Sequence, residues 1–430
     1  MAMNVYARRM AGITGLALMA AMFATPLGAL ADEAQRDQIA EETAAIRELP
    51  ALPEIDDQLI TSDELKAMLP DLLTKDYSPE QALADQRGLI AIGLLPPGTD
   101  LMAMQETLLG EQVAGFWDPD TDEMYVIDDS GEFDAMAQMT YSHETVHALQ
   151  DANLGLDDAM AESGVINSDA ATAAAALYEG DASAASFEFL AAHPELARKM
   201  VFSASGSSEE LDSSPAAVSI SLVFPYLAGE KFVSALRAEG GWDAVNAAYT
   251  NLPQSTEQIM HPEKYLVGEQ PVDVSAPDPT GALGSGWTPV VDDTMGELGI
   301  AVLLANLPPG KGINNFTGAI DLPVPALNAA AGWGGDRYAL WENGDRDLLV
   351  WDTAWDTDRD AGAFLRALAQ HQQDRFGGLF EGESGNDIAM VTDDVAIRLR
   401  QDGARVTMVQ GPDVATVDAA LAAVQAAPGA

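Results

Sequence analysis

One stretch, residues 140–151, constrains this chain more than any other, because it sets two histidines at a helical spacing. It contains His143, Glu144 and His147, with apolar residues at helix-compatible positions on both sides. Residues four apart lie on one face of a helix, so both imidazoles can point at the same place. Two imidazoles at this spacing suit a tetrahedral zinc ion that takes a third protein ligand and a water molecule. Glu144 follows the first histidine directly and is placed to act as a general base on that water.

Composition limits what else could hold a metal and what the protein could bind. The chain has no cysteine, which excludes disulfides, thiolate ligands and a cysteine nucleophile. Any metal must therefore be held by histidine and carboxylate groups. The formal net charge of the 430 residues is −47. Such a surface repels nucleic acid, so we expect no nucleic-acid partner.

The N-terminus, residues 1–31, is typical of a removable export signal. Arg8 and Arg9 form a basic start, Met10–Phe23 an apolar core, and Ala29–Ala31 a small-x-small cleavage site. We therefore expect an exported protein, either periplasmic or extracellular. No later run reaches the ~18 apolar residues of a membrane-spanning helix, so no membrane anchor is predicted. The oligomeric state stays open.

Hydrophobic periodicity and turn residues predict an α+β fold in three parts. Residues 32–112 favour a helical segment, and residues 113–270 favour a mainly helical core with a small hairpin beside the histidine helix. A stretch rich in proline, glycine and aspartate, residues 271–286, marks a boundary. Residues 287–430 predict a module with helices on one face of a sheet, including a hairpin at Asn343–Gly344.

Several local signals can be checked individually. Thr61 with Glu64, and Ser78 with Gln81, predict capping boxes at the starts of two helices. Pro70 is expected to kink the first of these helices or end it early. Four tryptophans of the C-terminal module are predicted to be core residues, with substrate docking as the alternative: Trp333, Trp341, Trp351 and Trp355.

A strand, a turn rich in aspartate and a second strand are expected over residues 113–127, just before the histidine helix. The edge of such a hairpin could pair with an extended peptide, which makes Phe116 and Trp117 candidates for substrate binding. The alternative is an ordinary hairpin that covers the core.

A third metal ligand is expected from the alanine-rich helix predicted over residues 168–192. Glu179 is our choice, because a second helix packed on the first can present its carboxylate to the metal. The small residues Gly180 and Ala182 would allow a close approach. The alternatives for the third ligand are Glu162, Asp169 and Asp181.

Two further roles have candidates. Asp181 and Asp151 could orient a metal-bound imidazole through a hydrogen bond. His261 is the first choice for donating a hydrogen bond to an oxyanion opposite Glu144, and Tyr265 and Tyr226 are the other options. For His261 the alternative role is to cap a short helix before Pro262.

The motif together with a downstream glutamate resembles the gluzincin branch of the zincin metallopeptidases. More of the chain resembles a largely uncharacterised group of exported bacterial proteins that combine this helix with a Glu-Gly-Asp-Ala segment. The stretches that carry this second resemblance are Ala114–Pro119, His143–Gln150, Glu179–Ala182, Phe224–Tyr226, Ser255–Tyr265 and Gly332–Arg337. The resemblance implies a zincin-like catalytic domain over residues 113–270, with one zinc ion and a peptide or protein substrate.

The sequence hypothesis is therefore an exported zinc metallopeptidase in which Glu144 is the general base. A non-catalytic exported binding protein on a zincin scaffold is the main alternative. Metal-dependent hydrolysis of a non-peptide amide or ester is a third possibility. The sequence does not identify the substrate or the cleavage preference.

Overall fold

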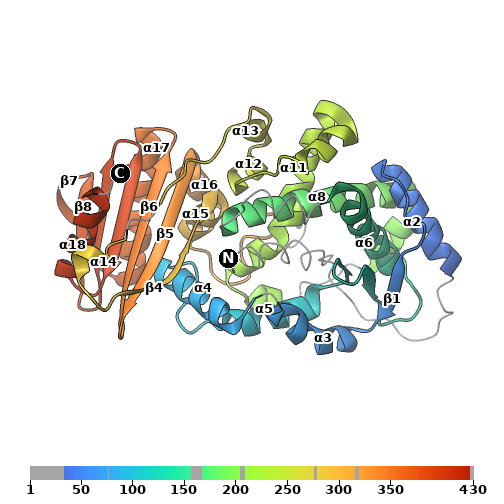
Figure 1. Cartoon of the computed structure of the whole chain (residues 1–430), viewed down its shortest axis with the longest axis horizontal. Coiled ribbons are helices and arrows are strands. Elements are labelled where there is room, and N and C mark those ends of the chain that lie inside the picture. Colours follow the sequence, from blue (N-terminus) through green and yellow to red (C-terminus); the bar gives the residue numbers. More distant parts are fainter. Residues whose placement is uncertain are drawn as a thin grey trace.

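The computed structural model describes residues 33–75, 77–155, 167–203, 209–275, 278–314 and 319–426. Within these ranges the predicted α+β fold is confirmed. Helices and a small sheet make up most of an elongated molecule, and a seven-stranded sheet forms one end (Figure 1). The predicted export signal and the alternative ligand Glu162 lie outside the described residues.

The N-terminal helices begin where the sequence places their caps. Both predicted capping boxes are present, at Thr61 and at Ser78. The helix does not end at Pro70, because it continues to Thr74 with the proline inside it. The buried Leu69 holds this turn against the core, and the Thr74 hydroxyl donates to the Pro70 carbonyl at 2.6 Å. The helices of this part are α2 (Glu33–Arg47), α3 (Ser62–Thr74), α4 (Pro79–Ile92) and α5 (Leu101–Gln112).

A three-stranded sheet contacts α6, and apolar residues of α3 and α5 pack against it. Its strands are β1 (Asp56–Ile60), β2 (Gly115–Asp118) and β3 (Glu123–Ile127), in the order β1-β3-β2. The predicted hairpin is the antiparallel pair β2–β3, and β1 adds to it in parallel. β2 is therefore an edge strand of this sheet.

Three long helices form the centre of the molecule, and α6 (Ala135–Leu154) and α11 (Ala216–Ala248) both pack on α8 (Ser168–Ala192). α8 and α11 touch at two glycines: a Cβ at Gly180 would overlap the backbone of Gly229. Short helices follow or connect them: α9 (Pro194–Ser203), α10 (Glu209–Ser213), α12 (Thr256–Met260) and α13 (Pro262–Leu266).

Among the described helices, α11 is long and apolar enough to cross a membrane by length and composition. More than half of its apolar window is buried inside the protein, and Gly240 and Gly241 break its helical geometry. Phe232, Val233 and Leu236 belong to the main core cluster. These are the properties of a core helix.

The C-terminal module is an antiparallel sheet in the order β4-β5-β6-β10-β9-β8-β7. The hairpin predicted at Asn343–Gly344 joins β5 to β6, whereas β4 was not predicted. The strands are β4 (Thr288–Asp293), β5 (Trp333–Asn343), β6 (Arg346–Trp355), β7 (Glu381–Ser384), β8 (Asp387–Val391), β9 (Ala396–Asp402) and β10 (Arg405–Gly411). The helices are α14 (Thr280–Leu283), α15 (Gly296–Ala305), α16 (Val324–Ala330), α17 (Asp358–Phe376) and α18 (Val414–Ala426).

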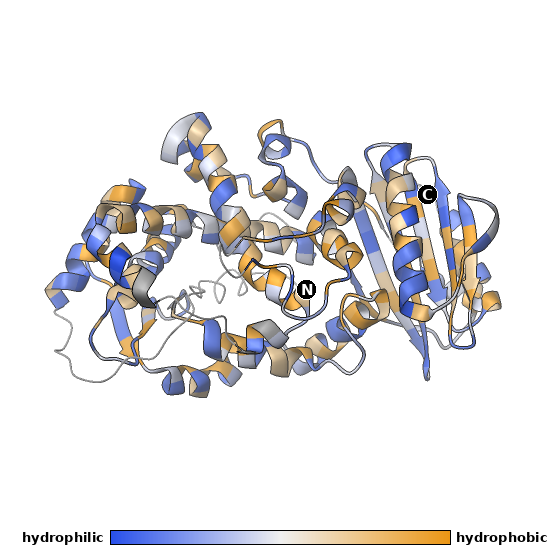
Figure 2. Cartoon of the chain, turned by 180° about the vertical axis from the view of Figure 1, so that it is seen from behind, coloured by the Kyte–Doolittle hydropathy of each residue, from blue (hydrophilic) through white to orange (hydrophobic). Residues whose placement is uncertain are grey.

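Helices cover both faces of this sheet, so the prediction of helices on one face is wrong. Side chains alternate between faces along a strand. On β6, Leu348 and Val350 pack in the cluster that contains α18, whereas Leu349 and Trp351 pack in the cluster that contains α17. Both faces of β6 are apolar, so each must pack against another element that shields it from water. The helix that crosses the near side of the sheet in Figure 2 carries both hydrophilic and apolar residues. Three of the four tryptophans predicted as core are buried, and Trp341 is half-buried.

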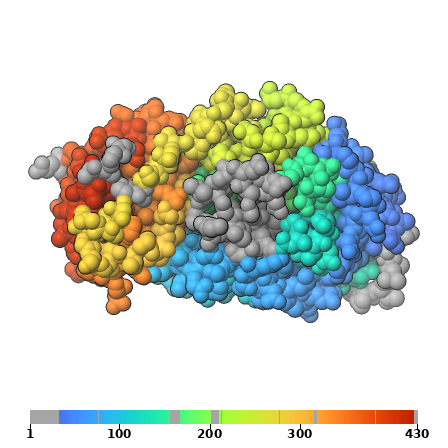
Figure 3. Space-filling view, in the orientation of Figure 1, coloured from blue at the N-terminus to red at the C-terminus, as the bar shows by residue number. Residues whose placement is uncertain are grey.

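Side chains of α17 join this module to the N-terminal helices. Arg375 donates hydrogen bonds to the carbonyls of Ala91 (2.8 Å) and Ile90 (2.6 Å) at the C-terminal end of α4. Gly93, which ends α4 with a φ of 102°, lies against Arg375 and the buried His371. In the space-filling view the N-terminal helices (blue) cover the right-hand end and the lower edge, yellow-green segments lie along the upper edge, and the C-terminal module (orange and red) forms the left-hand end (Figure 3).

Candidate metal centre

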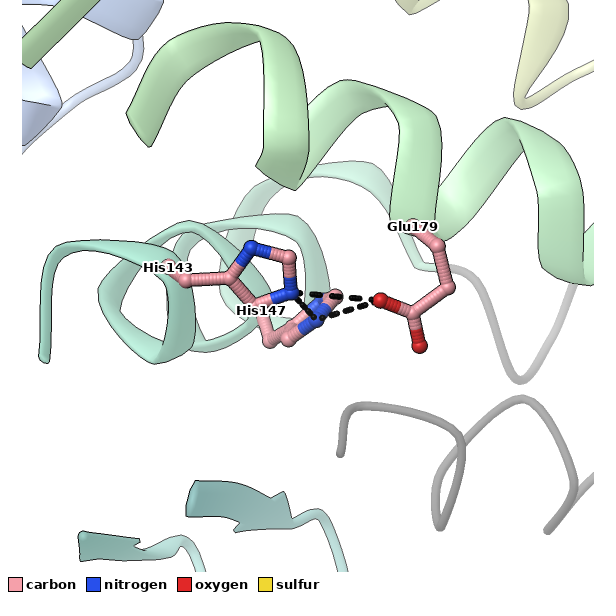
Figure 4. A group of neighbouring side chains, drawn as sticks. All are labelled: His143, His147 and Glu179. Atoms are coloured by element: carbon pink, nitrogen blue, oxygen red, sulfur yellow. Dashed lines mark hydrogen bonds and ion pairs between the residues drawn. The ribbon is translucent and has the colours of Figure 1, made fainter. Parts of the chain in front are cut away.

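Two helices bring three predicted ligands together. His143 and His147 on α6 face Glu179 on α8, and all three side chains are buried. The His143 Nε2 lies 3.1 Å from the His147 Nε2 and 3.2 Å from the Glu179 Oε2. The His147 Nε2 lies 3.4 Å from the same carboxylate oxygen. The three atoms therefore form a nearly equilateral triangle (Figure 4).

The dimensions of this triangle fit a tetrahedral metal ion. Zinc binds imidazole nitrogen and carboxylate oxygen at roughly 2.0–2.2 Å, which sets neighbouring ligand atoms of a tetrahedron about 3.3–3.6 Å apart. The observed separations of 3.1 to 3.4 Å lie at or just below this range. Three protein ligands leave one corner of a tetrahedron for water or substrate, which is the arrangement of catalytic rather than structural zinc sites.

A second group of acidic residues in the described chain has a different explanation. Glu257, Glu269 and Asp356 also lie close enough to surround an ion. The Lys264 Nζ already contacts all three, at 2.6, 2.8 and 3.0 Å. The lysine supplies the positive charge that this group requires.

Helix ends and a glycine contact fix the positions of the ligands. Asp134 caps the start of α6 by accepting hydrogen bonds from two backbone amides. Gly180, next to Glu179, lies against Gly229 of α11. We expected Gly180 to allow close approach to the histidine helix; instead it brings α8 onto α11. Glu179 is thus held between two packed helices.

The side chain of Gln150 orients His147. Its Oε1 lies 2.8 Å from the His147 Nδ1, and its Nε2 donates to the Tyr178 carbonyl and to Asp181 Oδ2, both at 3.1 Å. Because both Nε2 hydrogens have acceptors, the Oε1 must accept the hydrogen of Nδ1. The His147 Nε2 then carries the lone pair that a metal needs.

The two carboxylates expected to orient a histidine have other partners. Asp181 contacts Gln150, which bonds to His147, and it also accepts hydrogen bonds from Arg47 and from the Tyr249 hydroxyl (2.8 Å). Asp151 accepts a hydrogen bond from the Trp117 indole at 3.1 Å. Gln150 was not among the predicted site residues, although its position three residues after His147 places it on the same side of the helix.

Arg47 connects the first described helix to this network. The Arg47 and Asp181 side chains are both fully buried, and two hydrogen bonds of 2.5 and 3.0 Å join them. The Arg47 guanidinium also donates to Asn246 at 2.7 Å and lies over the Trp242 ring. A buried, doubly bonded ion pair holds its geometry firmly, because neither charge can be left alone in the interior.

Burial keeps both histidines in the neutral form that binds metal. It lowers the pKa of His147 to about 4, and burial is also the main reason that the pKa of His143 is lowered. The hydrogen bonds of His147 to Gln150 and of His143 to Glu179 oppose this effect but are the smaller influence on the two pKa values.

Glu144 and Tyr226 complete the chemistry of the site. Glu144 is fully buried. The Tyr226 ring centroid lies 6.0 Å from that of His143, and its hydroxyl forms a hydrogen bond with Glu179. Burial and the charges of Glu179 and Glu144 raise the pKa of Tyr226 well above its usual value, so the hydroxyl keeps its proton and remains a donor.

The hairpin reaches the site through its backbone rather than its aromatic side chains. Phe116 and Trp117 are buried, and Phe116 stacks on Tyr125. In this structure both side chains pack in the core, which is the arrangement of the ordinary hairpin named as the alternative. Gly115 lies so close to α6 that a Cβ there would come within 3.2 Å of Glu144 Cγ. The edge strand β2 thus runs beside the expected general base.

Three other candidates lie elsewhere. The His261 Nε2 lies 3.1 Å from Glu297 of α15. His261 occupies the N-cap position of α13, but its side chain makes no capping hydrogen bond there. The Tyr265 hydroxyl donates to the Asn251 carbonyl. Asp169 accepts hydrogen bonds from Thr256 and is not part of the triangle. Of the three oxyanion candidates, the structure brings Tyr226 to the candidate metal ligands.

Comparison with known proteins bears on the C-terminal module alone. A family described as a domain of unknown function, DUF8575, matches residues 288–421. This stretch begins with β4 and ends within α18, and it does not include the three candidate ligands. Neither the curated proteins nor the solved structures give a match to this chain.

Proposed function

We propose that this protein is a zinc-dependent metallopeptidase of the kind that its motif resembles. One observation carries the proposal: the ligand atoms of His143, His147 and Glu179 form a buried triangle of tetrahedral dimensions, and Glu144 follows the first of them in the helix. Glu179 takes the role of third ligand in preference to Asp169 and Asp181, because its carboxylate lies with both imidazoles, whereas Asp169 bonds to Thr256 and Asp181 pairs with Arg47.

Each residue of the site has a chemical task in this proposal. His143, His147 and Glu179 would hold zinc, which when bound acidifies water and polarises a carbonyl oxygen. Glu144 takes the proton of the attacking water and returns it to the leaving amine. The Tyr226 hydroxyl donates a hydrogen bond to the negative oxygen that develops on the substrate. Gln150 keeps His147 in the tautomer that binds metal.

An extended peptide is the substrate that the surroundings favour. β2 is the edge strand of its sheet and lies beside Glu144 at Gly115. An edge strand can bind a peptide through backbone hydrogen bonds, whatever the peptide sequence. The net charge of −47 disfavours nucleic acid. With the basic and apolar N-terminus, we propose a peptidase that acts in the periplasm or outside the cell.

The test is Glu144→Gln, with Glu188→Gln as the control, because Glu188 forms a half-exposed ion pair with Arg237. We expect both variants to bind one zinc ion per chain by elemental analysis. Hydrolysis of casein should fall about 10²–10⁴-fold in Glu144→Gln alone, which is the usual contribution of a general base.

Equal hydrolysis by the two variants would contradict the proposed mechanism. A correctly folded protein that binds no stoichiometric zinc would instead favour the non-catalytic binding protein. Activity on simple amides or esters but not on peptides would show that the substrates are non-peptide compounds.

A further inference from the structure

A cavity of about 290 Å³ lies between the N-terminal helices, the pair α8–α11 and the start of the C-terminal module. A closed apolar cavity of roughly 150 Å³ already binds benzene, so this one has room for a larger apolar group. Leucines from five helices supply much of its wall, among them Leu73, Leu89, Leu101, Leu108, Leu109, Leu222 and Leu298.

The cavity is long. On α11 it is lined by residues from Ala217 to Tyr226, spaced so that they share one face of the helix. At a rise of about 1.5 Å per residue this wall is about 13 Å long. The wall on α8, from Ser168 to Ala175, is about 10 Å long by the same measure. A single amino-acid side chain is shorter than either wall, so the shape suits a linear group.

One end of the cavity reaches the candidate metal centre. Tyr226 lines the cavity and also bonds to the ligand Glu179. Leu109 and Leu222, which line it as well, pack in the same cluster as Phe116 of the edge strand β2. A chain in the cavity would therefore lie next to both the metal ligands and the strand expected to hold the peptide.

The polar groups of the cavity favour a neutral occupant. Asp85 accepts a hydrogen bond from Tyr77, Asp293 accepts from Ser168, and Asp169 accepts from Thr256. Internal donors thus engage these acids, which leaves them poor partners for a cation. Burial also raises the pKa of Asp169 to about 8 and that of Asp293 to about 6. Among the described residues that line the cavity there is no lysine, arginine or histidine to attract an anion.

We propose that this cavity binds a linear acyl chain carried by the substrate, so that the substrates are acylated peptides. Cleavage of these acylated peptides rests on the proposed function, whereas binding of the acyl chain in the cavity does not. The chain lies along α11, with its polar end at Tyr226, and the apolar wall excludes water from it.

Binding can be measured without turnover, on the full protein carrying Glu144→Gln. The probes are N-acyl glycinamides from butanoyl to hexadecanoyl, titrated by calorimetry with and without zinc. Each methylene buried in the cavity should raise the affinity about fourfold, which corresponds to about 0.8 kcal/mol, until the cavity is full. Affinity should then stay constant for longer chains.

Two substitutions on one helix test the location. Ala171 of α8 lines the cavity and is half-buried, whereas Ala191 near the end of α8 is exposed. Ala171→Phe should weaken binding of the dodecanoyl amide at least tenfold, and Ala191→Phe should leave it unchanged. Leu108→Ala enlarges the cavity, so affinity should keep rising up to a longer acyl chain than in the parent protein. This variant tests the location if Ala171→Phe does not fold.

Affinity that does not depend on chain length would overturn the proposal, and so would equal weakening by both phenylalanine variants. An affinity that stops rising at butanoyl would assign the cavity to one peptide side chain and would also overturn it. Chain binding in a protein that hydrolyses nothing would refute the proposed function and leave this inference standing. Binding of free decanol as tightly as the decanoyl amide would show a lipid site rather than one for acylated peptides.

Discussion

Gln150 accepts a hydrogen bond from His147 Nδ1 at 2.8 Å and thereby connects this ring to a buried ion pair. The chain of contacts runs from His147 through Gln150 to Asp181 and ends at Arg47. An amide here holds the imidazole without adding a second negative charge next to Glu179. The position of the candidate ligand His147 is therefore linked to α2, which is nearly a hundred residues earlier in the sequence.

Gln150→Leu should weaken zinc binding by about 10- to 100-fold, because removing the partner of a metal-bound histidine has effects of this size. Competition with a chromophoric chelator measures the change. Gln138→Leu is the control, since Gln138 lies on the same helix and bonds only to the Phe133 carbonyl. If both variants bind zinc equally well, Gln150 does not position His147.

Arg47→Met should destabilise the protein by about 3–5 kcal/mol, because it leaves the Asp181 carboxylate buried without its cation. Urea unfolding measures the loss. The double variant Arg47→Met/Asp181→Leu should recover part of it, because neither charge is then buried alone. A double variant at least as unstable as the sum of the single variants would show that the two residues do not act as a pair.

Gly180→Ala should destabilise the protein by at least about 1–3 kcal/mol, the usual cost of overpacking, because its Cβ would overlap the Gly229 backbone. Gly299→Ala on α15 is the matched control. Its Cβ would lie 3.2 Å from the end of the flexible Met295 side chain, and alanine favours a helix. Equal melting temperatures for the two variants would contradict the contact between α8 and α11.

Acid should destabilise the wild-type protein more than His371→Leu. Burial lowers the pKa of His371 from 6.5 to about 4, and the nearby charge of Arg375 adds to this. The unfolded chain therefore binds the proton first. The stability contributed by the neutral ring is complete above pH ~6.5 and is lost as the pH falls toward ~4, to a total on the order of 3 kcal/mol. Urea unfolding of both proteins at pH 7 and pH 4.5 measures the difference. A constant difference between them at the two pH values would exclude this role for His371.

The sequence alone determined the local parts of this protein. The spacing of His143 and His147 fixes two imidazoles on one helix face, whatever surrounds the helix. The capping boxes at Thr61 and Ser78, and the turn at Asn343–Gly344, are signals between residues a few positions apart. They formed as predicted because the interactions that stabilise them are complete within one turn of chain.

Only the tertiary structure decided which distant residues meet these parts. Nothing near His261 or Tyr226 in the sequence shows that Tyr226 reaches the metal ligands while His261 pairs with Glu297. The packing of α8 on α11 makes that choice, through the contact of Gly180 with Gly229. The same holds for Arg47, whose cation is stable in the interior only because Asp181 arrives from α8. Contacts between elements depend on how whole faces pack, and the periodicity of one segment carries no information about its partner.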